Sequence, residues 1–431
     1  MKYLLLTANE TDGVGQHAVG LNKHLQKKGH NSKILLLHKN KTKNLSIIKL
    51  KRSIYLRLFN FIIFDLLKKN LKKIFTFGNS TIKFKDLENY IKEADIIIIY
   101  TMHKLLSFKT LTKIFECGKI VYLRPLDMEF ASGGCHVNLV NNDKNVCNKF
   151  IKGCDKCPQL NTLNLFNLSK RIFNKKKFLI EKYKPKVFVE NTYTQKIYNK
   201  SSIFSKHKVK KIFLGTNQNR QKNFTQKYAR QILNFSIKEK ILLFGTYNLD
   251  AKHKGGNLLP SILKNLNKII ETSNVNTNNN IRLVTFGRKN SFNIDEKKIK
   301  WTHIDLVKTD KKLNLLYRSA DVLLSPATYC NGPHIVSEAL ANNLPVIAFN
   351  VGVAQDNVIN KKNGYLVSCF KTKLFAESIY KVLFLKKIVD KEEVNKKLKK
   401  VFNSFYEAET IIKHSKRDIK IASYENKNIL R

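Results

Sequence analysis

The segment 330–352 limits the possible fold more than any other part of the chain, because it predicts loop, helix, buried strand and glycine turn in quick succession. Gly332 and Pro333 would open a helix whose first turn has free backbone N–H groups, a site suited to phosphate. The run Leu344–Phe349 is typical of a short strand in a parallel sheet that is covered on both faces. This order predicts an α/β sheet that binds a nucleotide diphosphate at the carboxyl edge of its strands.

The same alternation of strand and helix occurs in both halves of the chain. In the first half, apolar runs predict strands at 2–7, 32–37, 94–100 and 119–123, with a Gly13-Val14-Gly15 turn and a helix over 14–28 after the first strand. In the second half, we expect strands at 240–245, 282–287, 321–325 and 346–349, and helices at 256–270, 310–319, 336–341 and 373–385. Strands separated by helices imply right-handed crossovers and open parallel sheets.

The length of 431 residues is too great for one ordinary core, so two domains are the default. We place the junction near 211–220. This gives an N-terminal domain at 1–215, a C-terminal domain at 216–400 and a basic helical tail at 401–431. Two similar α/β domains are typical of nucleotide-sugar and dinucleotide enzymes, and the fold alone does not choose between them.

The net charge of +48 indicates an attraction to anions. Nucleic acid, an anionic membrane surface and an anionic substrate are the candidate partners. Lysines occur along almost the whole chain, which favours a general compositional bias over one dedicated binding patch. No RNA- or DNA-binding module is recognisable, so the sequence argues against nucleic acid as the partner.

The sequence predicts a cytoplasmic protein. Met1–Thr7 is a short apolar run without the h-region or cleavage site of a signal peptide, and no run approaches the ~20 apolar residues of a membrane span. Residues 52–77 predict a basic amphipathic helix. Such a helix can lie in a membrane interface or pack on its own domain, and the sequence leaves both open.

Cys135, Cys147, Cys154 and Cys157 form a separate constellation, with His136 next to the first of them. Cysteines of a cytoplasmic protein are more often thiols or metal ligands than disulfides. The spacing Cys154-x-x-Cys157 lets two thiolates share one zinc ion. Together the cysteines predict either a closed structural zinc site or a group of reduced thiols.

Three segments together resemble a known family of enzymes. They are Gly13-Val14-Gly15, the run from Asp127 to His136 (Asp-Met-Glu-Phe-Ala-Ser-Gly-Gly-Cys-His) and the stretch around Glu338. They look like retaining glycosyltransferases of family 4, of the colanic-acid, capsular and O-antigen polysaccharide type. The resemblance implies a GT-B fold, an α/β architecture of two Rossmann-like domains facing across a cleft, with a nucleotide-sugar donor held mainly by the C-terminal domain.

The resemblance assigns roles to residues in both domains. Gly13 and Gly15 match the glycine loop after the first strand, where the backbone can approach a diphosphate or sugar. Lys254 matches the lysine that contacts the donor phosphates, and its charge would stabilise the leaving diphosphate.

The C-terminal motif of the family departs from its usual pattern at one position. Glu338 matches the second glutamate of a pair, usually a ligand of the donor ribose, whereas the first glutamate would fall on Cys330. The missing carboxylate normally helps to position the donor sugar. We expect the donor phosphates to bind at Asn331, Gly332, Pro333 and His334.

A second departure lies at Leu126-Asp127, where the family commonly has His followed by Asp. The histidine contact with the transferred sugar is therefore lost or supplied from elsewhere. Asp127 and Glu129 remain as candidates to orient the acceptor hydroxyl or the sugar, and we count Asp127 with Lys254 and Glu338 as candidate catalytic residues. In this family the departing phosphate is thought to deprotonate the acceptor, so no protein base is required. No Asp-x-Asp motif is visible, so we expect catalysis without a cofactor.

The resemblance predicts a hexosyltransferase-type enzyme of surface polysaccharide assembly, such as lipopolysaccharide O-antigen or capsule. It would act at the inner face of a membrane on a lipid-linked glycan acceptor. The alternatives are a non-enzymatic basic protein that binds nucleic acid or membranes, a GT-B sugar-nucleotide epimerase, and a GT-B member that has lost catalysis.

Overall fold

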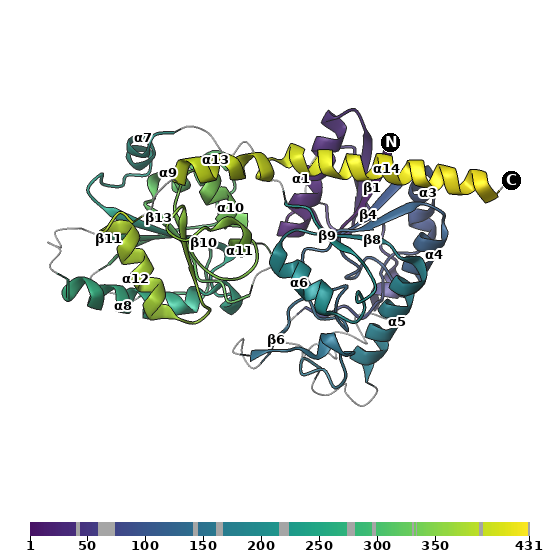
Figure 1. The fold of residues 1–431 in the computed structure, drawn as a ribbon, viewed down its shortest axis with the longest axis horizontal. Helices are drawn as coiled ribbons and strands as arrows, with labels where there is room; N and C mark the ends of the chain where they lie inside the picture. Colours follow the sequence, from purple (N-terminus) through teal and green to yellow (C-terminus); the bar gives the residue numbers. More distant parts are fainter. Residues whose placement is uncertain are drawn as a thin grey trace. The chain divides into compact units, whose positions relative to one another are not determined.

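The computed structural model describes the chain except for residues 40–43, 59–73, 141–144, 161–166, 215–223, 274–280, 295–298, 330, 331, 333, 388–390 and 430–431. The chain divides into two compact units (Figure 1). The first unit is Met1–Gly215 with Ser404–Arg431, and the second is Thr216–Asn403.

The first unit is built on a seven-stranded parallel sheet in the order β3-β2-β1-β4-β5-β8-β9. The strands are β1 (Lys2–Leu6), β2 (Asn31–Leu36), β3 (Ile47–Lys49), β4 (Ile96–Ile99), β5 (Ile120–Leu123), β8 (Lys186–Val189) and β9 (Val209–Lys211). All the isoleucines of β4 are buried, as expected for a strand with helices on both faces of its sheet. The strand order reverses between β1 and β4, so a topological switch point lies there.

The helices of the first unit begin at side-chain caps in several places. They are α1 (Gly13–Lys27), α3 (Lys85–Glu93), α4 (Phe108–Glu116), α5 (Leu168–Tyr183), α6 (Thr192–Lys200) and α14 (Ser404–Ile429). Asp12, Ser107 and Asn191 cap α1, α4 and α6 by accepting a backbone N–H of the first turn. A small hairpin of β6 (Leu139–Val140) and β7 (Asn145–Val146) and a 3₁₀ turn, η1 (Lys149–Ile151), lie between β5 and α5.

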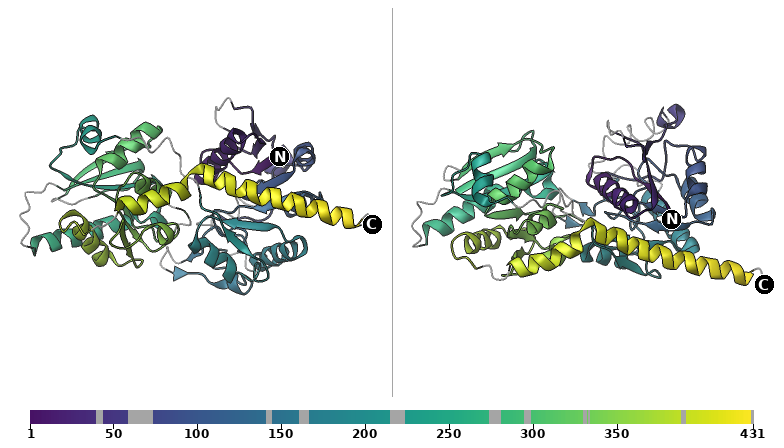
Figure 2. Two further views of the ribbon diagram at one scale, coloured as in Figure 1. Left: turned by 45° about the horizontal axis from the view of Figure 1, so that its top comes forward. Right: turned by 90° about the horizontal axis from the view of Figure 1, so that it is seen from above.

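The expected tail at 401–431 is helical, and from Ser404 onward it is part of the first unit. Its helix α14 packs against α1 (Figure 2). Ala408 and Ile411 of α14 are buried in the same cluster as Leu21 and Leu25 of α1. The C-terminal segment therefore completes one face of the N-terminal sheet.

The second unit has a six-stranded parallel sheet in the order β12-β11-β10-β13-β14-β15. Its strands are β10 (Lys240–Asn248), β11 (Ile281–Arg288), β12 (Lys300–Ile304), β13 (Val322–Ser325), β14 (Val346–Phe349) and β15 (Gly364–Val367). Its helical segments are α7 (Gln226–Ile232), η4 (Lys252–Lys254), η5 (Gly256–Leu258), α8 (Leu259–Glu271), α9 (Asp310–Ser319), α10 (His334–Ala341), α11 (Ala354–Asn357), α12 (Thr372–Leu383) and α13 (Lys391–Phe402). The switch point of this sheet lies between β10 and β13.

The predicted α/β architecture of two Rossmann-like units is confirmed. One local prediction is wrong: Gly13 and Gly15 lie in the first turn of α1 rather than in a turn before it, because Asp12 caps the helix there. The short strands β3, β8, β9, β12 and β15 were not predicted from the sequence. Of the basic segment 52–77, residues 54–58 are helical and 59–73 lie outside the described residues. Among the helices that the structure describes, none combines the length and the apolar character that crossing a membrane requires.

Candidate functional site

In the first unit, polar side chains gather in the loops that follow β1, β4, β5 and β8. These strands are neighbours in the sheet and parallel, so the loops meet at one carboxyl edge, beside the switch point between β1 and β4. Ligands of open α/β sheets bind at this position. The edge carries Asn9 and Asp12, Thr101 and His103, Asp127, Glu129 and His136, and Glu190.

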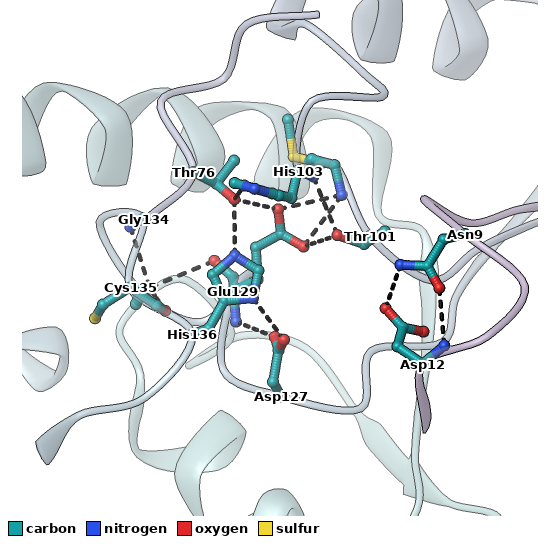
Figure 3. Close-up of polar contacts among 12 residues, drawn as sticks. Asn9, Asp12, Thr76, Thr101, His103, Asp127, Glu129, Gly134, Cys135 and His136 are labelled. Atoms are coloured by element: carbon teal, nitrogen blue, oxygen red, sulfur yellow. Dashed lines mark hydrogen bonds and ion pairs between the residues drawn. The ribbon is translucent and has the colours of Figure 1, made fainter. Parts of the chain in front are cut away.

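Glu129 is the buried centre of this group (Figure 3). Its carboxylate accepts hydrogen bonds from the hydroxyls of Thr76 and Thr101, each at 2.7 Å, and from the backbone N–H of Met102 at 3.1 Å. Both oxygens are thus used by the chain itself. Glu129 therefore holds its own loop against the segments of Thr76 and Thr101. Asp127 is the more exposed of the two carboxylates.

Asp127 and His136 form a close pair, with Asp127 Oδ2 2.6 Å from His136 Nδ1. The other carboxylate oxygen of Asp127 accepts the backbone N–H of Glu129 at 2.7 Å. His136 Nε2 lies 2.9 Å from Thr76 Oγ1, and the hydroxyl hydrogen of Thr76 is already donated to Glu129. This geometry suits the imidazolium form of His136, which can donate from both ring nitrogens.

The charges of the pair agree with this hydrogen-bond pattern. Burial alone would lower the pKa of His136, but the Asp127 carboxylate raises it above the usual value. Burial alone would raise the pKa of Asp127, and His136 brings it below the usual value instead. Each member of the pair thus favours the charged form of the other.

The role of His136 was missed in the sequence, which sets this residue beside the cysteines. In the structure the ring of His136 turns towards Asp127 (Figure 3). It also packs edge to face against the ring of His103, with 5.4 Å between the ring centroids. The sequence feature that could have indicated this role is the position of His136 directly after Gly133-Gly134-Cys135.

The two glycines before Cys135 are required by close packing. A Cβ on Gly133 would lie 2.4 Å from the carbonyl oxygen of Ser169, and a Cβ on Gly134 would lie 2.5 Å from that of Thr76. Gly134 also has a φ of +127°, which disfavours any side chain. The Gly-Gly pair therefore lets the loop reach Thr76, whose backbone N–H donates to the Gly134 carbonyl at 2.7 Å.

The turn after β1 is held by Asn9, which accepts the backbone N–H groups of Thr11 and Asp12. A Cβ on Gly15 would lie 1.9 Å from the carbonyl oxygen of Asn9, whereas a Cβ on Gly13 would meet nothing within 4 Å. The fold itself requires the glycine at position 15. Gly13 instead leaves open space at the carboxyl edge of the sheet.

Glu190 follows β8 and is buried. Its Oε1 accepts hydrogen bonds from the side chains of Asn191 and Thr194, and its Oε2 has no hydrogen-bond partner within the part of the chain that is described. Burial raises the pKa of Glu190 to about 7. The sequence alone does not single out Glu190, because a glutamate after a short strand of weak periodicity carries no distinctive pattern.

In the second unit, Glu338 lies on α10 and is buried. Its Oε2 accepts the hydroxyl of Tyr317, from α9, at 2.6 Å. The side chain of Asn342 donates to the backbone carbonyl of Glu338 at 2.9 Å and accepts from Asn314 at 3.1 Å. Two helices thus hold one carboxylate in place, and Tyr317 is a partner that the sequence did not reveal.

Lys254 lies in the turn η4, which follows β10. The next residue, Gly255, has a φ of +79°, and a Cβ there would lie 1.8 Å from the carbonyl oxygen of Pro326. The backbone N–H of Thr328 also donates to the carbonyl of His253 at 3.0 Å. The glycine therefore seats the Lys254 turn directly on the loop that leads from β13 to α10.

That loop contains the expected phosphate site. His334 is the first residue of α10, and Gly332 before it is half-buried. Asn331 and Pro333, together with Cys330, lie outside the described residues. The structure thus brings Lys254 and the start of α10 to the same sheet edge, at the switch point between β10 and β13.

Two groups of side chains in the first unit have metal-ligating atoms. One ligand atom each of Asp127, Glu129 and His136 lie within 4.8 Å of one another. Their oxygens and nitrogens already pair with one another and with the threonines, which is a complete hydrogen-bond network without a metal. The expected cysteines Cys135, Cys147, Cys154 and Cys157 all line one cavity.

Comparison with known proteins supports this reading of the fold. Residues 230–400 match the family described as glycosyl transferases group 1. No curated protein sequence matches the chain. Solved structures match over almost the whole length, and these neighbours are GT-B glycosyltransferases, so the chain has the GT-B fold.

Three of these structures illustrate the similarity. Sucrose-phosphate synthase (tll1590) of Thermosynechococcus elongatus is 15% identical, with a TM-score of 0.67 over 98% of this chain and 100% of the other. HepE (Alr3699) of Anabaena, in complex with UDP-glucose, is 12% identical, with a TM-score of 0.62 over 96% and 99% of the two chains. WaaG, a glycosyltransferase involved in lipopolysaccharide biosynthesis, is 12% identical, with a TM-score of 0.61 over 95% and 98%.

Proposed function

We propose that this protein is a glycosyltransferase that moves a sugar from a nucleotide-sugar donor to a hydroxyl of an acceptor glycan. The observation that carries the proposal is the arrangement in the second unit, where the Lys254 turn is seated on the loop that leads into α10. The family match covers this same region, and HepE has been crystallised with UDP-glucose.

The donor would be held by the second unit. The free backbone N–H groups at the start of α10 would bind the diphosphate, with Gly332 and His334 in the described part and Asn331 and Pro333 beside them. Lys254 would stabilise the charge that develops on the leaving diphosphate. Glu338, held by Tyr317, would accept hydrogen bonds from the donor ribose.

The acceptor and the transferred sugar would meet the carboxyl edge of the first sheet. The open space at Gly13 lets an incoming group approach the backbone. The cationic His136, paired with Asp127, is a donor that could replace the histidine missing at Leu126 and contact the sugar. This side supplies positioning and charge, while the leaving phosphate would take the acceptor proton and give retention of configuration.

The finer assignment is a hexosyltransferase of family 4 that acts on a lipid-linked surface polysaccharide. The resemblance of the Asp127–His136 segment to polysaccharide enzymes supports it, and WaaG is a structural neighbour with a lipopolysaccharide role. A peripheral location on the inner face of a membrane belongs to the same proposal.

A basic pocket in the first unit favours that location. It is lined by the side chains of Leu37, His38, Lys49, Leu50, Lys51, Arg52 and Arg57. No carboxylate in the described part of the chain forms an ion pair with these lysines and arginines. Each Lys or Arg close to anionic lipid contributes ~1 kcal/mol, so the pocket and the net charge would draw the protein to such a surface.

The first test is thermal stabilisation of the purified protein by UDP, GDP, ADP and several nucleotide-sugars. A ligand at about a hundred times its Kd stabilises a protein by ~2.7 kcal/mol, so a true donor gives a clear shift in Tm. We expect one nucleotide to protect the protein and the Glu338→Gln variant to lose this protection. Product analysis by NMR then gives the anomeric configuration of the bond formed on an added acceptor.

The alternatives give different outcomes in the same experiment. Protection by acidic polymers but by no nucleotide would overturn the transferase proposal in favour of a basic binding protein. Protection by a nucleotide-sugar without transfer to any glycan acceptor would indicate a degenerate member. Conversion of the donor without an acceptor would indicate an epimerase or hydrolase.

A further inference from the structure

The four cysteines that line one cavity come from separate parts of the loop between β5 and α5. Cys135 follows the Gly-Gly pair, Cys147 follows β7, and Cys154 and Cys157 follow η1. Cys135, Cys154 and Cys157 are buried and Cys147 is half-buried. The described part of this segment has little regular structure of its own, yet its four thiols line the same cavity.

The backbone is shaped around the sulfur atoms. Cys154 and Lys156 both have left-handed φ angles, 55° and 43°, which form a tight turn from Cys154 to Cys157. The backbone N–H of Gly133 donates to Cys154 Sγ at 3.1 Å. Amides aimed at sulfur stabilise thiolates, the form in which cysteine binds a metal.

Further backbone contacts hold Cys147 and Cys154 in the cavity. Cys147 N–H donates to the carbonyl of Asn138 at 2.6 Å, and the side chain of Asn138 donates back to the Cys147 carbonyl at 3.3 Å. Ser169, on α5, donates its hydroxyl to the Cys154 carbonyl at 2.6 Å. The cysteine backbones are thus anchored to the unit on two sides.

We propose that Cys135, Cys147, Cys154 and Cys157 bind one zinc ion as a closed, structural four-thiolate site. The ligand number and type fit zinc, and four thiolates leave no open position for catalysis. Binding replaces the thiol protons, which go to solvent, by four zinc–sulfur bonds and leaves a centre with two net negative charges. The proposal stands apart from glycosyl transfer, because it rests on the cysteines alone.

Zinc binding would require the four thiols to move closer together. Tetrahedral zinc with Zn–S bonds of about 2.3 Å places its sulfur atoms about 3.8 Å apart. The thiols are not among the described groups whose ligand atoms already lie within 4.8 Å of one another, so the side chains must draw together around the ion. Cys147 is half-buried whereas the other three cysteines are buried, so we expect its side chain to make most of this movement.

A buried cation beside the cavity supports an anionic centre. Lys176, on α5, is buried, and its Nζ donates to the carbonyl oxygens of Ser132 and Glu129. No ion pair links Lys176 to a carboxylate in the part of the chain that the structure describes. A buried ammonium is stable when opposite charge lies close by. The carboxylates of Glu129 and Asp127 supply part of this charge, and a zinc centre with two negative charges next to Cys135 and Cys154 would add to it.

The zinc site would also fix the loop that carries Asp127 and His136 at the carboxyl edge of the first sheet. Figure 3 shows the Cys135 sulfur pointing away from the neighbouring His136 ring. Two consecutive side chains thus face different sites, the thiol towards the cavity and the imidazole towards Asp127. Zinc bound on one side would hold His136 in position on the other.

The test is metal analysis of the full-length protein purified without chelator from zinc-supplemented cells. We expect about one zinc per chain by elemental analysis. Replacement by cobalt should give the visible d–d bands of a tetrahedral ion with sulfur charge-transfer bands in the near ultraviolet. The Cys147→Ser and Cys157→Ser variants should lose most of the metal, whereas Cys369→Ser, in the second unit, should keep it.

Intact mass under non-reducing conditions separates the remaining outcomes. Protein with zinc should alkylate fully after denaturation with chelator, since its thiols are reduced. Metal-free protein with freely alkylated thiols would overturn the proposal. Disulfides among these cysteines, or a metal content unchanged in both cysteine variants, would overturn it as well. The cobalt spectrum of the unmodified chain keeps the test valid if a variant fails to fold.

Discussion

Arg124 and Glu407 form a buried ion pair, with Nη2 2.8 Å from Oε1, although they lie 283 positions apart in the sequence. Arg124 follows β5, and Glu407 lies near the start of α14. Arg124 Nε also donates to Glu407, while Nη1 and Nη2 donate to the carbonyls of Phe188 and Ile212. His17 of α1 contacts the other oxygen of Glu407 at 3.1 Å. This network ties the C-terminal helix to the N-terminal sheet.

We expect Glu407→Gln to destabilise the first unit by on the order of 3 kcal/mol, because it leaves buried Arg124 without its counter-charge. Chemical denaturation followed by circular dichroism measures the change. Glu409→Gln is the matched control, since Glu409 is on the same helix and pairs with Lys28 at the surface. Equal effects of both substitutions would contradict the assigned role of the buried pair.

The same network predicts a loss of stability in acid. Burial alone would raise the pKa of Glu407, but His17 and Arg124 lower it to about 2. A carboxyl with a depressed pKa in the folded state contributes stability that is full above its unfolded pKa. This contribution should disappear as the pH falls from about 4.5 to about 2, and the Glu407→Gln variant should show a weaker pH dependence in that range.

Tyr317→Phe should weaken donor binding without a change in fold. The substitution removes the hydroxyl that donates to Glu338 at 2.6 Å, so the carboxylate loses its fixed orientation. We expect Kd for the nucleotide to rise by about 5- to 30-fold, as for the loss of about 1–2 kcal/mol. Calorimetric titration measures this Kd, and Tyr365→Phe is a control from the same unit because the Tyr365 hydroxyl donates to the carbonyl of Lys387, away from Glu338. An unchanged Kd in Tyr317→Phe would remove Glu338 from the donor site.

Lys254→Ala should lower kcat by about 10²–10³ if its charge stabilises the leaving diphosphate. Lys252, in the same turn and exposed, is the matched control, and Lys252→Ala should retain most of the activity. Steady-state assays with the donor found by thermal stabilisation measure both. Similar losses in both variants would indicate a general effect of positive charge instead.

Gly13→Ala and Gly15→Ala should fail in different ways. A Cβ at position 15 would lie 1.9 Å from the carbonyl oxygen of Asn9, so Gly15→Ala should lower the free energy of unfolding by about 1–3 kcal/mol. A Cβ at position 13 meets nothing within 4 Å, so Gly13→Ala should fold normally and lose transfer by blocking the ligand. Thermal melts and activity assays together separate the two effects. Full activity in Gly13→Ala would show that no ligand approaches this position.

The Asp127–His136 pair predicts a dependence of transfer on alkaline pH. Burial opposes the charge on His136, yet Asp127 raises the pKa of His136 above its usual 6.5. The ion pair is therefore complete below that range and is lost as the pH rises through the raised pKa. We expect kcat/KM to fall as the pH rises through this pKa. The His136→Gln variant should have low activity that does not change over the same pH range. A pH profile shared by both proteins would exclude His136 as its source.

The alternation of apolar runs was enough to predict the α/β class and the principal strands, whereas the roles expected of Lys254 and Glu338 came from the family resemblance and stay predictions. Such runs and the glycines between them are local signals, so a single sequence displays them. The short strands β8 and β9 were not predicted, because three or four residues carry too little periodicity. Glu190 follows β8 and was overlooked for the same reason.

The sequence by itself determined the α/β class, the principal strands and the cysteine spacing, since each depends on neighbours within a few positions. Only the tertiary structure decided that His136 faces Asp127 while Cys135 faces a cavity, that Tyr317 holds Glu338, and that α14 returns to the first unit. These pairings join residues from different elements, and the buried environment selects them by requiring each charge and each hydrogen-bond donor to find a partner. That requirement acts in three dimensions and leaves no periodic trace along the chain.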